Sequence, residues 1–292
     1  LMNSQTGKII TTATHQNDSF IPTPNVWEKI QDVAVIEEKV SEVISHLFMN
    51  KPDGEVDSIG ISNQMHGIMY YDADGNAVSP LYIWQDERSN LPYKDGKTYA
   101  QYLGSFAGYG LVTDFYNREN SLVPETAVGV CTIGDYIAMK LTGTKKALMH
   151  ITNAASFGCF DINKNEFTID NGMLPEVTAD FATVGEWNGI KVSVAIGDNQ
   201  ASFLGSVRDP ETTALANFGT GSQISFLASA DAGMTNGSSV EVRPFPGGRY
   251  LISGSALCGG RAYALLERFF REAFSVVRQD TGEPYWLLNR LA

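Results

Sequence analysis

One short segment limits the fold more than any other. The run Val192-Ser193-Val194-Ala195-Ile196 is mostly apolar and β-branched, and it stops at the polar turn Gly197-Asp198-Asn199-Gln200. Such a run predicts a buried strand, and the residues after the turn are typical of a helix start. The chain is therefore predicted to be an α/β protein in which this strand ends in a polar turn.

Other patterns support a mixed α/β chain without a simple repeat. Apolar residues at three- and four-residue spacing predict a helix over about 36–47, and Thr132 and Gly143 are the expected N-cap and stop of a helix over 132–141. Strands are predicted at 58–62, 68–71, 81–84 and 250–253, strands 214–218 and 223–227 should form a hairpin, and a helix should follow Gly260.

Length and charge narrow the function classes. With 292 residues the chain is long enough for two domains, and its net charge of −12 argues against duplex nucleic acid or an anionic membrane as a partner. Cys131, Cys159 and Cys258 are far apart and odd in number, which indicates reduced thiols. We find neither a signal-peptide pattern at the start nor an apolar run of membrane-spanning length, so a cytoplasmic location is the default expectation.

Three groups of residues could carry chemistry, and the first is Asp198. A carboxylate at the end of a buried strand has a fixed backbone and an exposed side chain, as a general base requires. The alternative is that Asp198 only caps the following helix.

The second group is the hairpin tip Gly219-Thr220-Gly221-Ser222. It offers two hydroxyls and backbone N–H groups unobstructed by Cβ atoms, which suits a phosphate. The alternative is an ordinary tight turn without a ligand.

The third group is Gln64-Met65-His66-Gly67 together with Trp84-Gln85-Asp86. Paired donors and acceptors beside an indole ring match the hydroxyls and the C–H faces of a sugar. The alternative is that His66 and Trp84 are half-buried core residues. The four histidines are scattered and do not pair at metal-ligand spacing, so no protein metal site is predicted.

Taken together, these segments resemble the FGGY family of carbohydrate kinases over residues 5–275. Ile61-Ser62-Asn63-Gln64-Met65-His66-Gly67 is similar to the sugar-contacting strand end of the family, and Trp84-Gln85-Asp86 to its tryptophan motif. Ile196-Gly197-Asp198-Asn199-Gln200 resembles its Gly-Asp-x-Gln signature, and Asn217-Phe218-Gly219-Thr220-Gly221-Ser222 its second phosphate-binding turn.

The resemblance implies an actin- and hexokinase-like (ribonuclease H-like) two-domain fold and transfer of the γ-phosphoryl group of ATP, with Mg²⁺, to a terminal sugar hydroxyl. Asp198 would be the catalytic base. The residues implied to bind the sugar are Gln64, Met65, His66, Trp84 and Gln200. Those implied to bind nucleotide or phosphate are Gly219, Thr220, Gly221, Ser222, Gly259 and Gly260.

His150 to Gly158 and Trp84-Gln85-Asp86-Glu87-Arg88 look most like the sedoheptulokinases of the family, and xylulokinases and gluconokinases share Gln-Met-His-Gly. The absence of an obvious cation beside that motif favours a neutral ketose such as sedoheptulose, although Arg88 could reverse the preference. A homodimer is left open.

Two expected motifs are not found: the first Asp-x-Gly-Thr-Thr phosphate hairpin and the later adenine-binding glycine motif. The chain is therefore expected to be truncated at both ends, with a sugar-binding domain at 1–202 and an incomplete nucleotide-binding domain at 203–292. A non-catalytic sugar-binding fragment is the alternative from another class.

Overall fold

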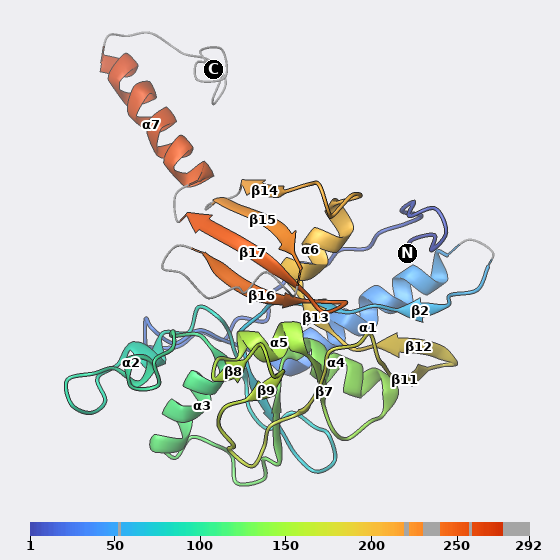
Figure 1. The fold of residues 1–292 in the computed structure, drawn as a ribbon, viewed down its shortest axis with the longest axis horizontal. Helices are drawn as coiled ribbons and strands as arrows, with labels where there is room; N and C mark the ends of the chain where they lie inside the picture. Colours follow the sequence, from blue (N-terminus) through green and yellow to red (C-terminus); the bar gives the residue numbers. More distant parts are fainter. Residues whose placement is uncertain (52–53, 219–221, 230–239, 257–258, 277–292) are drawn as a thin grey trace. The chain divides into compact units, whose positions relative to one another are not determined.

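A computed structural model describes residues 1–51, 54–218, 222–229, 240–256 and 259–276 of the chain (Figure 1). The chain divides into two compact units, Leu1–Ala201 and Ser202–Ala292. Each unit is described by itself below. The assignment of 1–202 to sugar and 203–292 to nucleotide stays a prediction.

Two sets of short strands run alongside each other at the centre of the first unit. β12 (Ile190–Ser193) pairs in parallel with β2 (Ser58–Ile59) and in antiparallel fashion with β11 (Thr183–Trp187), and β13 (Ile196–Gly197) pairs in parallel with β3 (Ser62–Asn63). The sequence predicted one strand over 192–196 and one over 58–62, but each is interrupted. The register shifts by one residue at the break, because Val192 lies opposite Ile59 whereas Ile196 lies opposite Ser62, so the later run contains one extra residue.

Two predicted helices pack in this unit. α1 (Val33–Met49) contains the predicted 36–47 segment, and the Asp32 side chain caps its first turn. α4 (Ile133–Thr142) begins with a capping box between Thr132 and Asp135 and ends at Gly143, which has the left-handed φ of 72° that favours glycine. Both predicted ends of α4 are confirmed.

The remaining strands and helices of the first unit surround its core. The predicted strand 68–71 is β4 (Met69–Tyr71), while the one predicted over 81–84 stops early as β5 (Leu81–Tyr82), which leaves Trp84 in a loop. The other elements are β1 (Ile30–Gln31), η1 (Arg88–Asn90), α2 (Tyr99–Tyr102), α3 (Gly110–Glu119), β6 (Gly129–Cys131), β7 (Leu148–His150), α5 (Ile151–Ser156), β8 (Phe160–Asp161), β9 (Glu166–Phe167) and β10 (Glu176–Thr178).

Two apolar clusters form this core. One joins α1, α4, β4 and β5 around Tyr71, Leu81 and Ile137, and the other includes Ile68, Leu111 and Phe157. Cys131 is a free, buried thiol whose pKa is raised by burial, and Cys159 is free and half-buried, whereas Cys258 lies outside the described residues. No helix in the described part of the chain is long and apolar enough to cross a membrane.

The second unit contains a four-stranded antiparallel sheet in the order β14-β15-β17-β16 (Figure 1). Its strands are β14 (Leu215–Phe218), β15 (Ser222–Ala228), β16 (Glu241–Phe245) and β17 (Arg249–Ala256). The register Phe218↔Ser222 confirms the predicted hairpin strands. α6 (Asp198–Ser206) contributes Phe203 to a small core with Phe245 and Leu251, and the predicted C-terminal helix is α7 (Gly260–Val276).

Candidate active site

Two parallel strand ends bring the first and third predicted groups to the same sheet edge. β3 and β13 are paired with Ile196 opposite Ser62 and Gly197 opposite Asn63. Gln64 directly follows β3, and Asp198 directly follows β13. Because the two strands are parallel, both motifs leave the sheet side by side. Residues 134 positions apart in the sequence therefore share one edge.

Asp198 begins α6 and its side chain is exposed, as a base that meets a solvent-borne substrate requires. The turn before it is tightly packed. A Cβ at Gly197 would lie 2.8 Å from Gln200 Oε1 and 2.9 Å from Met65 Sδ, so a larger residue would have to displace these two buried side chains. Gln200 is fully buried and Met65 is 5% exposed, and their roles in sugar binding stay predictions.

His66 is held in an unusual backbone conformation. Its φ is 73°, which costs free energy for a non-glycine residue and is found most often at functional sites. His66 N–H donates to Ser156 Oγ at 3.0 Å, and its ring stacks on Tyr109 with the ring centroids 4.4 Å apart. His66 Nδ1 lies 2.9 Å from Ser156 O, and since a carbonyl only accepts, Nδ1 must carry the hydrogen. The ring is thus fixed in both orientation and tautomer.

Trp84 is 53% exposed, which rules out the alternative that it is a core residue. Its backbone is nevertheless closely packed, because a Cβ at Gly108 would lie 2.1 Å from Trp84 O. An exposed indole on an immobile backbone is suited to stacking on the C–H face of a sugar.

Arg88 lies four residues further on and is buried. Its Nε donates to Asp86 Oδ1 at 2.7 Å, its Nη1 to Asn117 Oδ1 at 2.8 Å, and its Nη2 to Glu28 Oε1 at 3.2 Å. The guanidinium also lies 4.3 Å from the centre of the Tyr82 ring. Arg88 is 1% exposed and binds carboxylates of the protein itself, so it is not presented to a substrate carboxylate.

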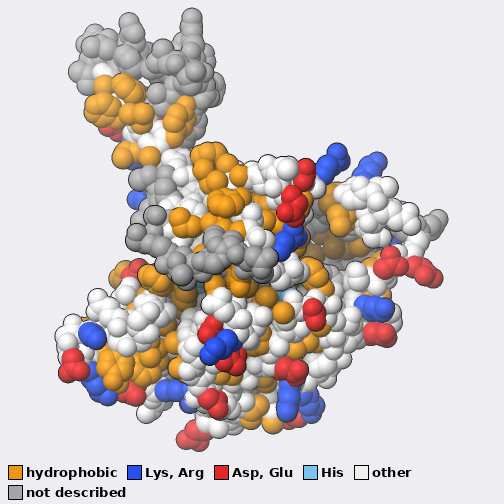
Figure 2. All heavy atoms as spheres, in the orientation of Figure 1, with side chains coloured by type: hydrophobic (Ala, Val, Ile, Leu, Met, Phe, Trp, Pro, Cys, Tyr) orange, Lys and Arg blue, Asp and Glu red, His pale blue; other side chains and the backbone are white. Residues whose placement is uncertain are grey.

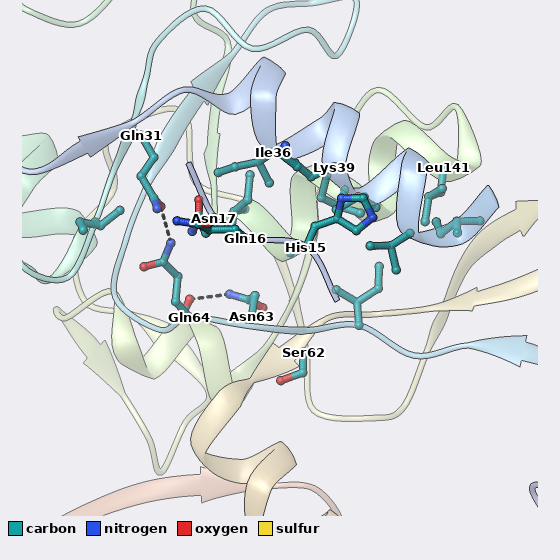
Figure 3. A pocket seen from close by; sticks show the side chains of 18 of the residues that line it. His15, Gln16, Asn17, Gln31, Ile36, Lys39, Ser62, Asn63, Gln64 and Leu141 are labelled. Atoms are coloured by element: carbon teal, nitrogen blue, oxygen red, sulfur yellow. Dashed lines mark hydrogen bonds between the residues drawn. The ribbon is translucent and has the colours of Figure 1, made fainter. Parts of the chain in front are cut away.

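A cavity of 780 Å³ lies on one side of β2 and β3, and Figure 3 shows side chains that line it. Its walls are mainly aliphatic side chains of α1 and α4, and its polar end contains Gln64, whose Nε2 donates to Gln31 Oε1 at 2.9 Å. Trp84 also lines it, whereas Asp198 and His66 do not. A sugar needs dense hydrogen bonding, so we place the candidate site at the strand ends and not in this largely apolar cavity.

The nucleotide-binding predictions are only partly within the described residues. Gly219, Thr220 and Gly221 lie outside them, and Ser222 is the first residue of β15. Gly260 begins α7, and Gly259 O accepts from Ala262 N–H at 3.0 Å, so this pair opens a helix as predicted. Their contact with a nucleotide stays a prediction.

Sequence reasoning missed four buried polar residues that support the site: Asn63, Thr152, Asn153 and Ser156. Three of them belong to the segment 150–158, which resembles its family counterpart but had no assigned role. Their only local signal is the placement of polar residues directly after β7. The hydrogen bonds that connect these residues to the site join residues more than 40 positions apart, so these contacts appear only in the tertiary structure.

Within the described ranges, no three His, Cys, Asp or Glu side chains are grouped as metal ligands. The chemistry of a Mg²⁺ ion that arrives with ATP is compatible with this, because Mg²⁺ keeps several waters and binds through phosphate oxygens and one or two carboxylates.

The fold is the one found in solved sugar kinases. The structure resembles a xylulose kinase from Lactobacillus acidophilus with a TM-score of 0.71 at 19% identity, covering 86% of this chain and 55% of that one. A gluconate kinase from the same organism gives a TM-score of 0.72 at 20% identity, covering 84% and 55%.

Sequence comparisons define the family more closely. Residues 1–103 match the N-terminal domain of the FGGY family of carbohydrate kinases. The sedoheptulokinase of Mus musculus is 30% identical over 249 residues, which is 72% of this chain and 50% of that protein, and the glycerol kinase of Aquifex aeolicus is 26% identical over 311 residues, 97% of this chain and 62% of that protein. The chain belongs to the FGGY family, and it spans about half the length of the curated relatives it matches.

Proposed function

We propose that the protein is an ATP-dependent carbohydrate kinase that phosphorylates a terminal hydroxyl of a sugar. The observation that carries the proposal is the parallel register of β3 and β13, which sets Asp198 beside Gln64, Met65 and His66. Phosphoryl transfer to a sugar hydroxyl requires a base next to the groups that bind the sugar.

In this mechanism Asp198 accepts the proton of the attacking hydroxyl while Gln64, His66 and Trp84 orient the sugar. ATP would supply the γ-phosphoryl group, and Mg²⁺ together with N–H groups of the predicted phosphate-binding residues Gly219 to Ser222 and Gly259-Gly260 would balance its charge. Most of the catalysis is positioning, which agrees with the fixed His66 ring and the tightly packed Gly197 turn.

The proposed substrate is a neutral ketose such as sedoheptulose, with xylulose as the alternative. The burial of Arg88 against Asp86 and Glu28 supports this choice, because gluconate would require a cation for its carboxylate. A non-catalytic sugar-binding role is the alternative from another class. A cytoplasmic location and a homodimer stay predictions.

A coupled ADP-release assay tests the proposal. The product of the complete reading frame is supplied with ATP, Mg²⁺ and sedoheptulose, xylulose or gluconate in turn. We expect turnover with a ketose and none above background with gluconate. Calorimetric sugar binding without any ADP release would support the sugar-binding role, and turnover with gluconate alone would contradict the role given to Arg88.

A further inference from the structure

The segment that joins β7 to α5 contains buried polar side chains that the proposed mechanism does not use. His150, Thr152 and Asn153 are each 0% exposed. Burying a polar group without a hydrogen-bond partner costs free energy, so buried polar side chains are expected to have hydrogen-bond partners. Here Thr152 and Asn153 are hydrogen-bonded to the two strand segments that end at the candidate site, and His150 is hydrogen-bonded to Thr152.

Thr152 holds the residue directly before the base. Its Oγ1 accepts from Gly197 N–H at 3.2 Å. His150 Nδ1 lies 3.0 Å from the same oxygen and accepts from Thr152 N–H at 3.3 Å, so the imidazole nitrogen is an acceptor and the threonine hydroxyl donates to it. Because this donation orients the hydroxyl, an oxygen lone pair is directed at Gly197 N–H.

Asn153 ties the two strands to each other. Its Nδ2 donates to Asn63 Oδ1 at 3.1 Å and to Ala195 O at 3.2 Å, which uses both hydrogens. Rotating the carboxamide by 180° would set its oxygen against two acceptors, so this orientation is the only one that fits. Asn63 Nδ2 in turn donates to Gln64 O at 2.7 Å.

We propose that Thr152 and Asn153 are positioning residues that hold the strand end bearing Asp198 in register with the strand end bearing Gln64 and His66. The inference rests on the proposed kinase function. Neither side chain touches the substrate, and both act through the backbone of residues 195–197. Misplacement of a reacting group by about 1 Å can cost about 100-fold in rate, so a small shift of this turn is enough to matter.

A matched pair of variants tests the role of Thr152. Thr152→Val keeps the shape and removes the oxygen, whereas Thr152→Ser keeps the oxygen. We expect Thr152→Val to lower kcat by about 10-fold or more with the sugar KM changed less than about threefold, and Thr152→Ser to remain within about threefold of the wild type in kcat. Equal kcat values for the two variants would overturn the proposal.

Hydrogen–deuterium exchange of the segment 195–200 supplies a readout that does not depend on activity. Exchange should be faster in Thr152→Val than in Thr152→Ser, with α1 unchanged as the internal reference. Unchanged exchange would also overturn the proposal. If the wild type turned over no ATP, the kinase function would fail while the exchange data still decided the positioning role.

Asn153→Ala provides a second route if Thr152→Val does not fold. The substitution removes the hydrogen bonds from Asn153 to Asn63 and Ala195, and it places a good helix former in α5. The expected result is the same lower kcat and faster exchange of 195–200. A folded Asn153→Ala protein with wild-type kcat and exchange would contradict the role of Asn153.

Discussion

At the scale of single residues, two aspartates show how placement decides the use of a carboxyl group. Asp198 follows a strand end and is exposed, so its carboxylate can reach a substrate. Asp135 lies in the first turn of α4, is 1% exposed, and accepts from Thr132 Oγ1 at 2.7 Å through one oxygen only. Burial raises the pKa of Asp135 to about 7, although the Thr132 bonds oppose this.

Replacing Asp198 tests its role as the base. Asp198→Asn keeps the size of the side chain but cannot accept the proton, so we expect kcat to fall by about 10²- to 10⁴-fold with sugar binding retained. Steady-state ADP release and calorimetric sugar titration measure the two quantities. A variant that kept more than half of the wild-type kcat would exclude Asp198 as the base.

The buried Asp135 predicts a pH-dependent stability. Its pKa is higher in the folded chain than in the unfolded one, so the folded state binds more protons between about pH 4 and pH 7 and its stability falls as pH rises through that range. Asp135→Asn should remove this decline, which is at most ~1.4 kcal/mol per pH unit. Urea unfolding of both proteins at several pH values measures it, and identical pH profiles would contradict the prediction.

At the scale of elements, α4 approaches the strands of the site through a glycine. A Cβ at Gly134 would lie 2.4 Å from Asn63 Oδ1 and 2.9 Å from Ala195 Cβ. Asn153 Nδ2 donates to the same Asn63 Oδ1 and to the backbone oxygen of Ala195. The closeness of helix and sheet therefore depends on the absence of one methyl group, and it connects the packing of α4 to the candidate site.

Gly134→Ala is expected to destabilise the first unit by about 1–3 kcal/mol through overpacking and to lower kcat, because Asn63 must move. Gly205→Ala is the matched control: it also lies in a helix, and nothing lies within 4 Å of its Cβ position. That variant should be neutral or more stable by up to about 1 kcal/mol. Thermal and urea unfolding give the comparison, and a Gly134→Ala protein as stable as the control would disprove the close approach.

At the scale of the whole molecule, α7 presents an apolar surface to solvent. Leu265, Leu266 and Phe269 are 64%, 46% and 62% exposed, and apolar side chains gather on this helix in Figure 2. Contiguous apolar surface of this kind is uncommon on monomeric proteins and promotes association.

We therefore expect this 292-residue chain to associate through α7. Static light scattering should give a mass above 31.8 kDa at high protein concentration, and the double variant Leu265→Glu, Phe269→Glu should return it to 31.8 kDa. Val26→Glu, at a side chain that is 87% exposed in the first unit, is the control and should leave the mass unchanged. A wild-type mass of 31.8 kDa at every concentration would refute the expectation.

Local patterns in the sequence were sufficient for several elements. The apolar spacing of α1, the cap and stop of α4, the hairpin strands β14 and β15, and the start of α7 all depend on contacts within a few residues, and each was predicted correctly. The turn that begins at Gly197 was likewise visible as a polar turn after an apolar run, and the role of Asp198 in it stays a prediction.

Only the tertiary structure decided where strands break and which distant residues meet. The runs 58–62 and 192–196 are each interrupted where their mutual register shifts by one residue, which no local pattern records. Arg88, a candidate substrate cation by sequence, is neutralised by Asp86 and Glu28, and Asn153 finds its partners 90 and 42 residues away. Local sequence determines periodicity and capping because those depend on near neighbours, whereas burial and long-range hydrogen bonds depend on how the whole chain packs.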